Sequence, residues 1–326
     1  MAEDAPIWVL LGHRTGDNNQ LLRVADELGL PYRAIRLDYN ALREVPVGLL
    51  GSSLASLSGR SKAEIRPPWP KLVLGIGNRS VPAALAIRKL SGGKAKLVRL
   101  GNPRVPPAKF DLVITTAQYS MPDAPNVLRL PAGISTAAPT QPTSEEAEWL
   151  SALPRPHRLF LIGGDTFMWT LPPATVAKAL SHVIGKPGSV IAITSGRTAP
   201  DLREFVAQAL RASDNARMGS DFPRYAVLVH DADGIIVTAD SVAMISDAIA
   251  TGKRVGLLEP EMTAAGRFFY GLAKAGRSVP VRDIRRFWTS VRAIGLAGSV
   301  EEPRAGKLAL DPLETSVTAI RKLLAG

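Results

Sequence analysis

The clearest structural signal in the chain is RLFLIGGDT, residues 158–166, where a short apolar run ends at two glycines. Such a run is typical of a strand buried on both faces, and glycines after it are typical of a turn into a helix. Helical spacing follows at residues 173–184. The pattern then repeats, because SVIAIT (189–194) leads through SGRT (195–198) into a helical stretch at 200–212. This repetition predicts a mostly parallel sheet with helices on both faces.

The same alternation runs outward in both directions from this signal. Before it, strand-like runs and helical stretches alternate at 7–11, 17–28, 32–37, 71–74, 81–90, 96–100 and 111–115. After it, they alternate at 235–237, 242–250 and 255–258. Residues 225–229 fit a strand or a helix end equally well. Five prolines and a Ser/Thr-rich middle interrupt the pattern at residues 131–157. We therefore predict two doubly wound, Rossmann-like α/β domains, at 1–150 and 151–310, that face each other across a cleft. A helix at 311–326 is expected to pack back on the first domain.

Composition excludes several classes of protein. Hydrophobic residues make up 46% and charged residues 21% of the 326 positions, which is a globular composition. The absence of cysteine excludes disulfides, thiol nucleophiles and thiolate metal sites. The acidic start and the lack of an apolar run of roughly 18 residues predict a cytoplasmic protein. The net charge of +11 suits phosphorylated ligands or an anionic membrane surface, and because the basic residues form no long block we expect no nucleic-acid partner.

Three loops of the first domain are candidates for the acceptor side of a site, because each follows a predicted strand. Their polar or glycine positions are Gly16, Asn18, Asn19 and Gln20, then Asn78 and Arg79, then Asn102 and Arg104. The first loop also holds His13 and Asp17, although Asp17 alone fits a helix cap equally well. The second loop resembles a dinucleotide fingerprint that lacks its last glycine, and Lys96-Leu97-Val98-Arg99 stands where a ribose-binding acid is expected, which argues against a nicotinamide. The third loop fits a plain proline turn equally well.

Loops of the second domain are candidates for a phosphate cradle. They combine glycines, hydroxyls and a cation at the starts of helices, where free N–H groups favour anions. The candidate positions are Gly163, Gly164, Asp165, Thr194, Ser195, Arg197, Thr198, Thr238, Asp240, Ser241, Met244, Ser246 and Asp247. The simpler interpretation of the last group is a helix capped by Asp240 or Ser241.

Asp231-Ala232-Asp233 raises the question of a metal, since an Asp-x-Asp pair after a strand holds a divalent cation in one class of glycosyltransferases. The following residues, 234–237, resemble a strand, so we interpret the pair as a turn and expect no metal.

Together the loops resemble the mitochondrial-fission (elongated-mitochondria) family, whose bacterial members are glycosyltransferase-like proteins of the GT-B type. The matching segments are 16–20, 101–104, 110–113, 126–127, 161–164, 197–200 and, most specifically, 238–248. The second domain is also similar to the lipid-linked N-acetylglucosaminyltransferase of peptidoglycan synthesis. That similarity implies that Gly163 and Gly164 meet a donor diphosphate and that Asp247 holds the ribose, at a position where both families usually have Glu.

The combined prediction is a metal-independent glycosyltransferase that uses a nucleotide-diphosphate sugar as substrate and needs no cofactor. Helix N-termini and Arg197 would neutralise the departing diphosphate, while Asp17, with His13 in reserve, would deprotonate an acceptor hydroxyl. The acceptor is expected to be lipid-linked or a glycan. The rival interpretation is a non-catalytic, membrane-associated adaptor on the same scaffold.

Residues 267–292 favour a peripheral position on an inner membrane. This stretch carries seven basic residues against the single acid Asp283, with five aromatic side chains among them. Cations beside aromatic rings are typical of segments that lie at a bilayer surface. The alternative is that the rings are core residues and the arginines a solvated face.

Overall fold

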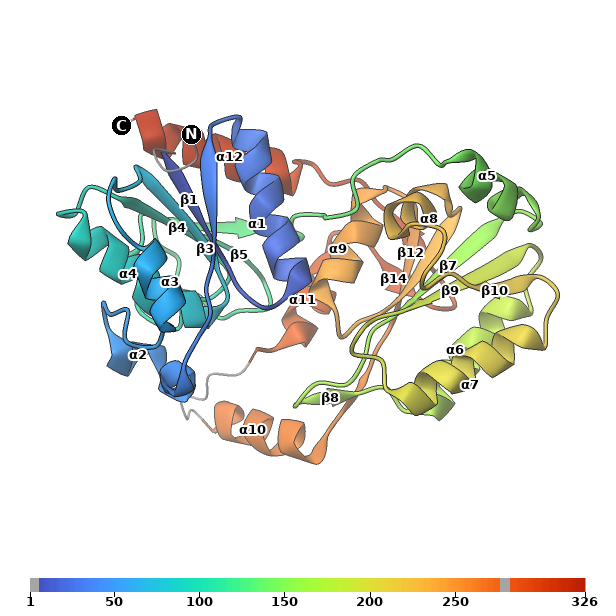
Figure 1. Cartoon of the computed structure of the whole chain (residues 1–326). Coiled ribbons are helices and arrows are strands. Elements are labelled where there is room, and N and C mark those ends of the chain that lie inside the picture. The colour runs from blue at the N-terminus through green and yellow to red at the C-terminus, as the bar shows by residue number, and fades with distance from the viewer. Residues whose placement is uncertain (1–5, 276–281, 326) are drawn as a thin grey trace. The chain divides into compact units, whose positions relative to one another are not determined.

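The computed structural model describes residues 6–275 and 282–325. The chain divides into two compact units, Met1–Thr136 with Leu310–Gly326 (unit 1) and Ala137–Ala309 (unit 2). Residues 137–150, which the sequence placed in the first domain, belong to unit 2 because α5 (Ser144–Ser151) packs Leu150 into the core of that unit. The C-terminal helix α12 (Pro312–Ala325) belongs to unit 1, where it lies beside α1 (Thr15–Leu28) (Figure 1).

Unit 1 contains a six-stranded parallel sheet. In chain order its strands are β1 (Ile7–Leu11), β2 (Tyr32–Arg36), β3 (Leu72–Ile76), β4 (Lys96–Leu100), β5 (Leu112–Thr116) and β6 (Val127–Leu130). In space they follow the order β2-β1-β3-β4-β5-β6. The strand order therefore reverses between β1 and β3, the place at which doubly wound sheets open a crevice.

Helices cover both faces of this sheet. On one face α1 and α12 bury the apolar side chains of Leu21, Val24 and Ile320. On the other face lie α3 (Gly59–Glu64) and α4 (Val81–Leu90). Residues 40–70, for which the sequence predicts no helix or strand, contain α3, the four-residue helix α2 (Val47–Leu50) and the 3-10 turn η1 (Ala41–Glu44). Helices this short leave no repeat in the sequence. Two further 3-10 turns are η2 (Asn78–Ser80) and η3 (Pro107–Lys109).

Unit 2 repeats the design around a second sheet. Its parallel strands are β7 (His157–Ile162), β9 (Ser189–Thr194), β10 (Ala216–Met218), β11 (Gly234–Thr238), β12 (Arg254–Leu258) and β14 (Gly298–Ser299), in the order β10-β9-β7-β11-β12-β14. The short strand β15 (Arg304–Ala305) pairs antiparallel with β12, and β8 (Trp169–Thr170) pairs with β13 (Glu261–Met262) outside the sheet. Here the order reverses between β7 and β11.

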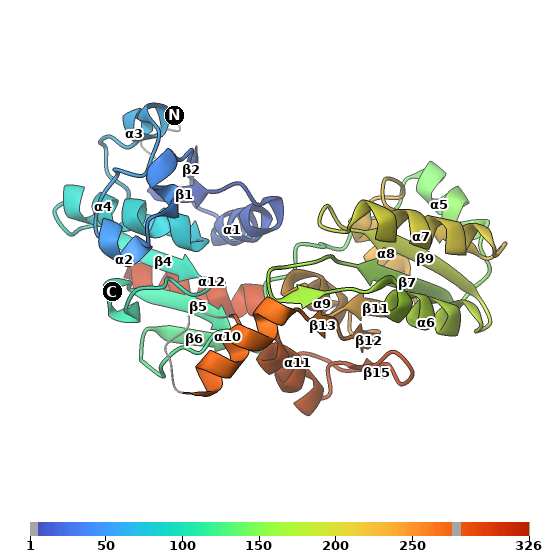
Figure 2. The ribbon, with the colours of Figure 1, turned by 90° about the horizontal axis from the view of Figure 1, so that it is seen from below.

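The helices of unit 2 also form two layers. One face of the sheet is covered by α6 (Pro173–Ile184) and α7 (Pro200–Arg211) (Figures 1 and 2). The other face is covered by α5, α8 (Tyr225–Asp231), α9 (Val242–Ala250) and α11 (Ile284–Ala293), and α10 (Ala264–Lys274) follows β13. The ambiguous run at 225–229 is thus the helix α8, which buries Val227, Leu228 and Val229. The two parallel, helix-covered sheets confirm the predicted fold class.

Candidate functional site

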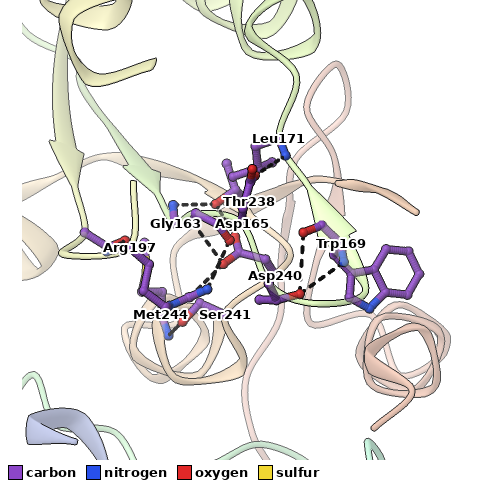
Figure 3. A network of polar contacts seen from close by, with 12 residues as sticks. Gly163, Asp165, Trp169, Leu171, Arg197, Thr238, Asp240, Ser241 and Met244 are labelled. Atoms are coloured by element: carbon purple, nitrogen blue, oxygen red, sulfur yellow. Dashed lines mark hydrogen bonds and ion pairs between the residues drawn. The ribbon is translucent and has the colours of Figure 1, made fainter. Parts of the chain in front are cut away.

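Three loops of unit 2 meet at the carboxyl edge of its sheet. They follow β9, β7 and β11, which are neighbours in the sheet, so their carboxyl ends lie side by side. Figure 3 shows side chains from all three loops pointing toward one another, with Arg197 and Asp240 bonded at their centre. The sheet thus brings together predicted positions that are about 30 to 80 residues apart in the sequence, at the point where the strand order reverses.

Asp240 is the centre of this network. Its side chain is 1% exposed and pairs with the guanidinium of Arg197 at 2.7 Å. The backbone N–H of Gly164 donates to the same carboxylate at 3.2 Å, and the Thr238 hydroxyl donates at 2.7 Å. Arg197 also donates to the carbonyl oxygen of Gly164 at 3.0 Å, while 44% of its side chain remains exposed. A buried carboxylate needs such partners, and here they join all three loops.

The two glycines are required by close packing in the protein itself. A Cβ atom on Gly163 would lie 2.2 Å from Oδ1 of Asp240, and one on Gly164 would lie 2.0 Å from the carbonyl oxygen of Arg197. The N–H of Gly163 donates to the Thr238 hydroxyl at 2.7 Å. The glycine pair therefore lets the loop after β7 pack in direct contact with the loops after β9 and β11.

Several other predicted positions shape their own loops. The Thr198 hydroxyl accepts from the Ser195 N–H at 2.9 Å and donates to the carbonyl oxygen of Ile162 at 3.1 Å. The N–H of Thr194 donates to the Ser220 hydroxyl at 3.1 Å. The exposed Asp165 accepts from the N–H of Leu171 at 2.9 Å. These bonds fix the conformations of the loops from within the chain.

The α9 positions serve mainly to begin and bury the helix. Ser241 caps it by accepting from the N–H of Met244 at 3.4 Å, and the buried Ser246 donates to the carbonyl oxygen of Val242 at 2.7 Å. The ribose candidate Asp247 is 4% exposed.

The carboxylate of Asp247 already has partners inside unit 2. It accepts from the Tyr225 hydroxyl at 3.0 Å and from the N–H of Ala137 at 3.3 Å. Burial raises the pKa of Tyr225, and the charge of Asp247 raises it further. Asp247 would therefore meet a ribose with part of its acceptor capacity already used inside unit 2.

The candidate residues of the first loop of unit 1 follow β1, where the strand order of that sheet reverses. Asn18 closes the loop, because its amide accepts from the N–H of Gly12 at 2.8 Å and donates to the Gly12 carbonyl oxygen at 2.9 Å. The ring of the exposed His13 lies 5.8 Å from that of Tyr39. Asp17 is half-buried in the first turn of α1; Gly16 and Asn19 are exposed and Gln20 is half-buried.

The other two loops of unit 1 are also partly occupied. Arg79 is exposed and pairs with Glu44 at 3.2 Å, next to the exposed Asn78. Asn102 accepts from the N–H of Arg104 at 2.8 Å, in a turn where Arg104 has a φ of 56°. Asn102 therefore shapes the turn that presents the exposed Arg104.

Arg99, in β4, is the residue of this edge that the sequence analysis missed as a site residue. It is fully buried, donates to the Ser80 hydroxyl at 2.8 Å and to the carbonyl oxygen of Gly77, and burial lowers its pKa to about 10. The charges of Tyr39, Tyr119 and Asp17 act in the opposite direction. An arginine within the apolar run 96–100 is a signal that was present in the sequence.

Asp231 and Asp233 lie at the end of α8 and in the turn before β11. Asp231 contacts Nδ1 of His157 at 2.6 Å, and Asp233 pairs with Arg155 at 2.9 Å and accepts from the N–H of His157 at 2.7 Å. Both carboxylates thus fasten the amino edge of the sheet. Among the described residues, no group of three or more His, Asp or Glu side chains is placed to hold a metal ion.

Comparison with known proteins finds both a family and a fold. Residues 15–291 match the family model described as mitochondrial fission ELM1. The uncharacterized protein RP120 of Rickettsia prowazekii is 29% identical over 109 residues, which span 33% of this chain and 30% of that protein.

Two solved structures are similar over nearly the whole chain. The co-structure of S. aureus MnaA with UDP has a TM-score of 0.57 at 14% identity, covering 98% of this chain and 96% of the other. The UDP-GlcNAc 2-epimerase of Neisseria meningitidis bound to UDP-GlcNAc has a TM-score of 0.53 at 13% identity, covering 98% and 99%. At these identities the likeness concerns the fold alone.

Proposed function

The chain belongs to the mitochondrial fission ELM1 family, and we propose that it is a metal-independent glycosyltransferase whose second unit binds a nucleotide-diphosphate sugar. The observation that carries this proposal is the convergence of three loops on the Arg197–Asp240 pair. Doubly wound sheets bind ligands where their strand order reverses, and this pair lies there. The UDP and UDP-GlcNAc in two structures of similar fold support the choice of donor.

In this proposal the chain's own groups take up negative charge from a departing diphosphate. Arg197 is nearly half exposed and uses only part of its five N–H donors on Asp240 and Gly164. The helices α7 and α9 begin at the same edge, and helix N-termini attract anions. As the bond between the anomeric carbon and the diphosphate oxygen breaks, these groups would hold the negative charge that leaves with the diphosphate.

The carboxyl edge of unit 1 supplies the acceptor side in this proposal. The acceptor oxygen forms the new bond to the anomeric carbon and gives its proton to the carboxylate of Asp17. The charge of Asp17 interacts with the buried guanidinium of Arg99 and raises the pKa of that arginine against the effect of its burial. His13 is the reserve base.

We also propose that the protein works at an anionic membrane, on a lipid-linked or glycan acceptor. Gly266 is the buried residue of α10, while Phe268 is 63%, Tyr270 38% and the nearby Phe167 69% exposed. The helix also carries Arg267 and Lys274 and no acidic residue. These are the two features that an interfacial helix needs.

Only part of the stretch at 267–292 supports this membrane surface. Phe287 and Trp288 of α11 are buried in the core of unit 2, which corrects their interfacial interpretation, and residues 276–281 lie outside the described part. No helix in the described ranges is both long and apolar enough to cross a bilayer.

The test is incubation of the full chain with UDP-GlcNAc in EDTA, followed by measurement of UDP release and of the sugar product. UDP release that increases with added lipid-linked acceptor is expected. Asp17→Asn should then lower kcat while leaving the affinity for UDP unchanged. A changed sugar that is still joined to UDP would instead mark an epimerase. Binding of UDP-GlcNAc without turnover would favour the adaptor.

A further inference from the structure

A cavity of about 880 Å³ lies at the amino edge of the second sheet, opposite to the loops that converge on Asp240. It opens beside the starts of β7, β11 and β12. Its apolar lining includes Val183, Ile236 and Val300, which belong to the core under α6 and α7. Its volume falls in the range of small-molecule sites, about 300–1,000 Å³. Neither the donor site nor the acceptor side proposed above includes any part of it.

The charges around this cavity favour an anion. Its cations are Arg158, Lys186, Arg254 and Arg304, and its acids are Asp233, Glu301 and Glu302. None of the four cations forms an ion pair with another residue in the described ranges 6–275 and 282–325. Asp233, in contrast, is already neutralised by Arg155, which is not part of the lining. The cavity therefore has an excess of unpaired positive charge.

Arg158 is the residue whose surroundings indicate that a ligand binds. It lies in β7, opposite Gly234 in β11, and its Nη1 is buried without a hydrogen-bond partner in the described structure. Burial lowers the pKa of this guanidinium, and the charge of Asp233 only partly offsets the effect. The Arg158 side chain as a whole is half-buried, but leaving its buried Nη1 donor unbonded costs free energy, which a bound anion would recover. The planar N–H fork of arginine matches phosphate oxygens in particular.

We propose that this cavity is a second ligand site, which binds a small organic molecule carrying a phosphate or diphosphate group. Arg158 donates to the phosphate oxygens, and Lys186, Arg254 and Arg304 surround the group. The apolar side chains of Val183, Ile236 and Val300 contact the organic part, for which the volume leaves room.

The test is hydrogen–deuterium exchange of the full chain with two probes, inorganic pyrophosphate and 1-naphthyl phosphate. Both probes should slow exchange in residues 183–188 and 300–305, and naphthyl phosphate should bind more tightly because it also buries a ring. Arg158→Met should weaken binding, measured by calorimetry, by about 10- to 150-fold, as expected for a lost hydrogen bond to a charged group. Arg211→Gln, a change of the same charge at a side chain that is 71% exposed in α7, should leave it unchanged.

Two surface variants keep the proposal testable if Arg158→Met unfolds. Arg304→Gln should weaken binding, and Glu302→Gln should tighten it severalfold by removing a like charge; both residues are exposed. Tighter binding to a less acidic lining is a result that a merely structural role would not produce. Absence of protection in 183–188 and 300–305 at millimolar probe, or equal affinity in all variants, would overturn the proposal. Slowed exchange confined to residues 163–166 and 195–198 would also overturn it, because it would place the anion at the donor site.

Discussion

Substitution of Gly163 by alanine tests whether Asp240 dictates the glycine at this position. The new Cβ would lie 2.2 Å from one carboxylate oxygen of Asp240 and 2.3 Å from the other, so the carboxylate must retreat by about 1 Å or more. Retreat breaks its contacts with the Arg197 guanidinium at 2.7 Å and the Gly164 N–H at 3.2 Å. Hydrogen bonds of a charged group contribute about 1.5–3 kcal/mol, and overpacking costs about 1–3 kcal/mol. We therefore expect Gly163→Ala to lower the free energy of unfolding by about 3–5 kcal/mol.

The decisive measurement is a double-mutant cycle with Asp240→Ala. Removal of the carboxylate removes the obstacle, so in that background Gly163→Ala should cost only about 1 kcal/mol, a coupling of about 2–4 kcal/mol. Gly164→Ala is the matched control, because its Cβ meets the backbone oxygen of Arg197 at 2.0 Å and is not relieved. Gly196→Ala, with nothing within 4 Å of its Cβ, should be nearly neutral.

Scanning calorimetry of the full chain reads out the cycle. For a unit of this size each kcal/mol shifts the Tm by about 2–4 °C, so Gly163→Ala alone should lower the Tm of unit 2 by roughly 6–20 °C. An equal cost of Gly163→Ala in the presence and absence of the Asp240 carboxylate would refute the reasoning.

Three further predictions concern other parts of the molecule. Asp247→Ala should lower the Tm, because the Tyr225 hydroxyl and the Ala137 N–H lose their buried acceptor at a cost of about 1–3 kcal/mol each. Titration calorimetry with UDP tests whether Asp247 also binds the ribose. An unchanged affinity for UDP would make Asp247 purely structural. The hydrogen bond from Arg224 lowers the pKa of Glu146, in α5, to about 2. The ionised Glu146 therefore stabilises the fold fully above the ordinary pKa of 4.5, and this contribution is lost as the pH falls toward 2. Glu146→Gln should flatten that acid limb of a Tm-against-pH curve. Cosedimentation with phosphatidylglycerol vesicles should fall as the salt concentration rises. It should also weaken when Arg267 and Lys274 are changed to Glu, since each cation near an anionic surface contributes about 1 kcal/mol. Equal binding to neutral vesicles would contradict the membrane proposal.

The local elements of the fold were predictable because their signals are local. A strand buried on both faces is a continuous apolar run, and β7, β9 and β11 each show one that ends at a glycine or hydroxyl loop. Helical spacing likewise marked α1, α4, α6 and α9. Elements without such signals were missed. β10 has three residues and contains Arg217, and β14 and β15 have two residues each.

The sequence alone also identified the loops that meet around Asp240, but not what their residues do there. Gly163 and Gly164 were assigned to a ligand, yet the need for glycine comes from Asp240 and Arg197, side chains that arrive from other strands. Asp247 was assigned to a ribose from its position in a motif. Its burial beside Tyr225 depends on how α8 packs against α9.

Partners that are distant in the chain decided the remaining questions. The aromatic residues of one basic stretch of sequence have two different environments, because α11 buries Phe287 in the core of unit 2 while α10 leaves Phe268 63% exposed. Arg99 gained its importance from Ser80 and Gly77, which only the pairing of β3 with β4 brings to it. Local composition and periodicity specify which segments become strands, helices and loops. The burial and hydrogen-bond partner of each polar group depend on contacts across the fold, and those contacts are set by strand order and packing, which a single sequence does not display.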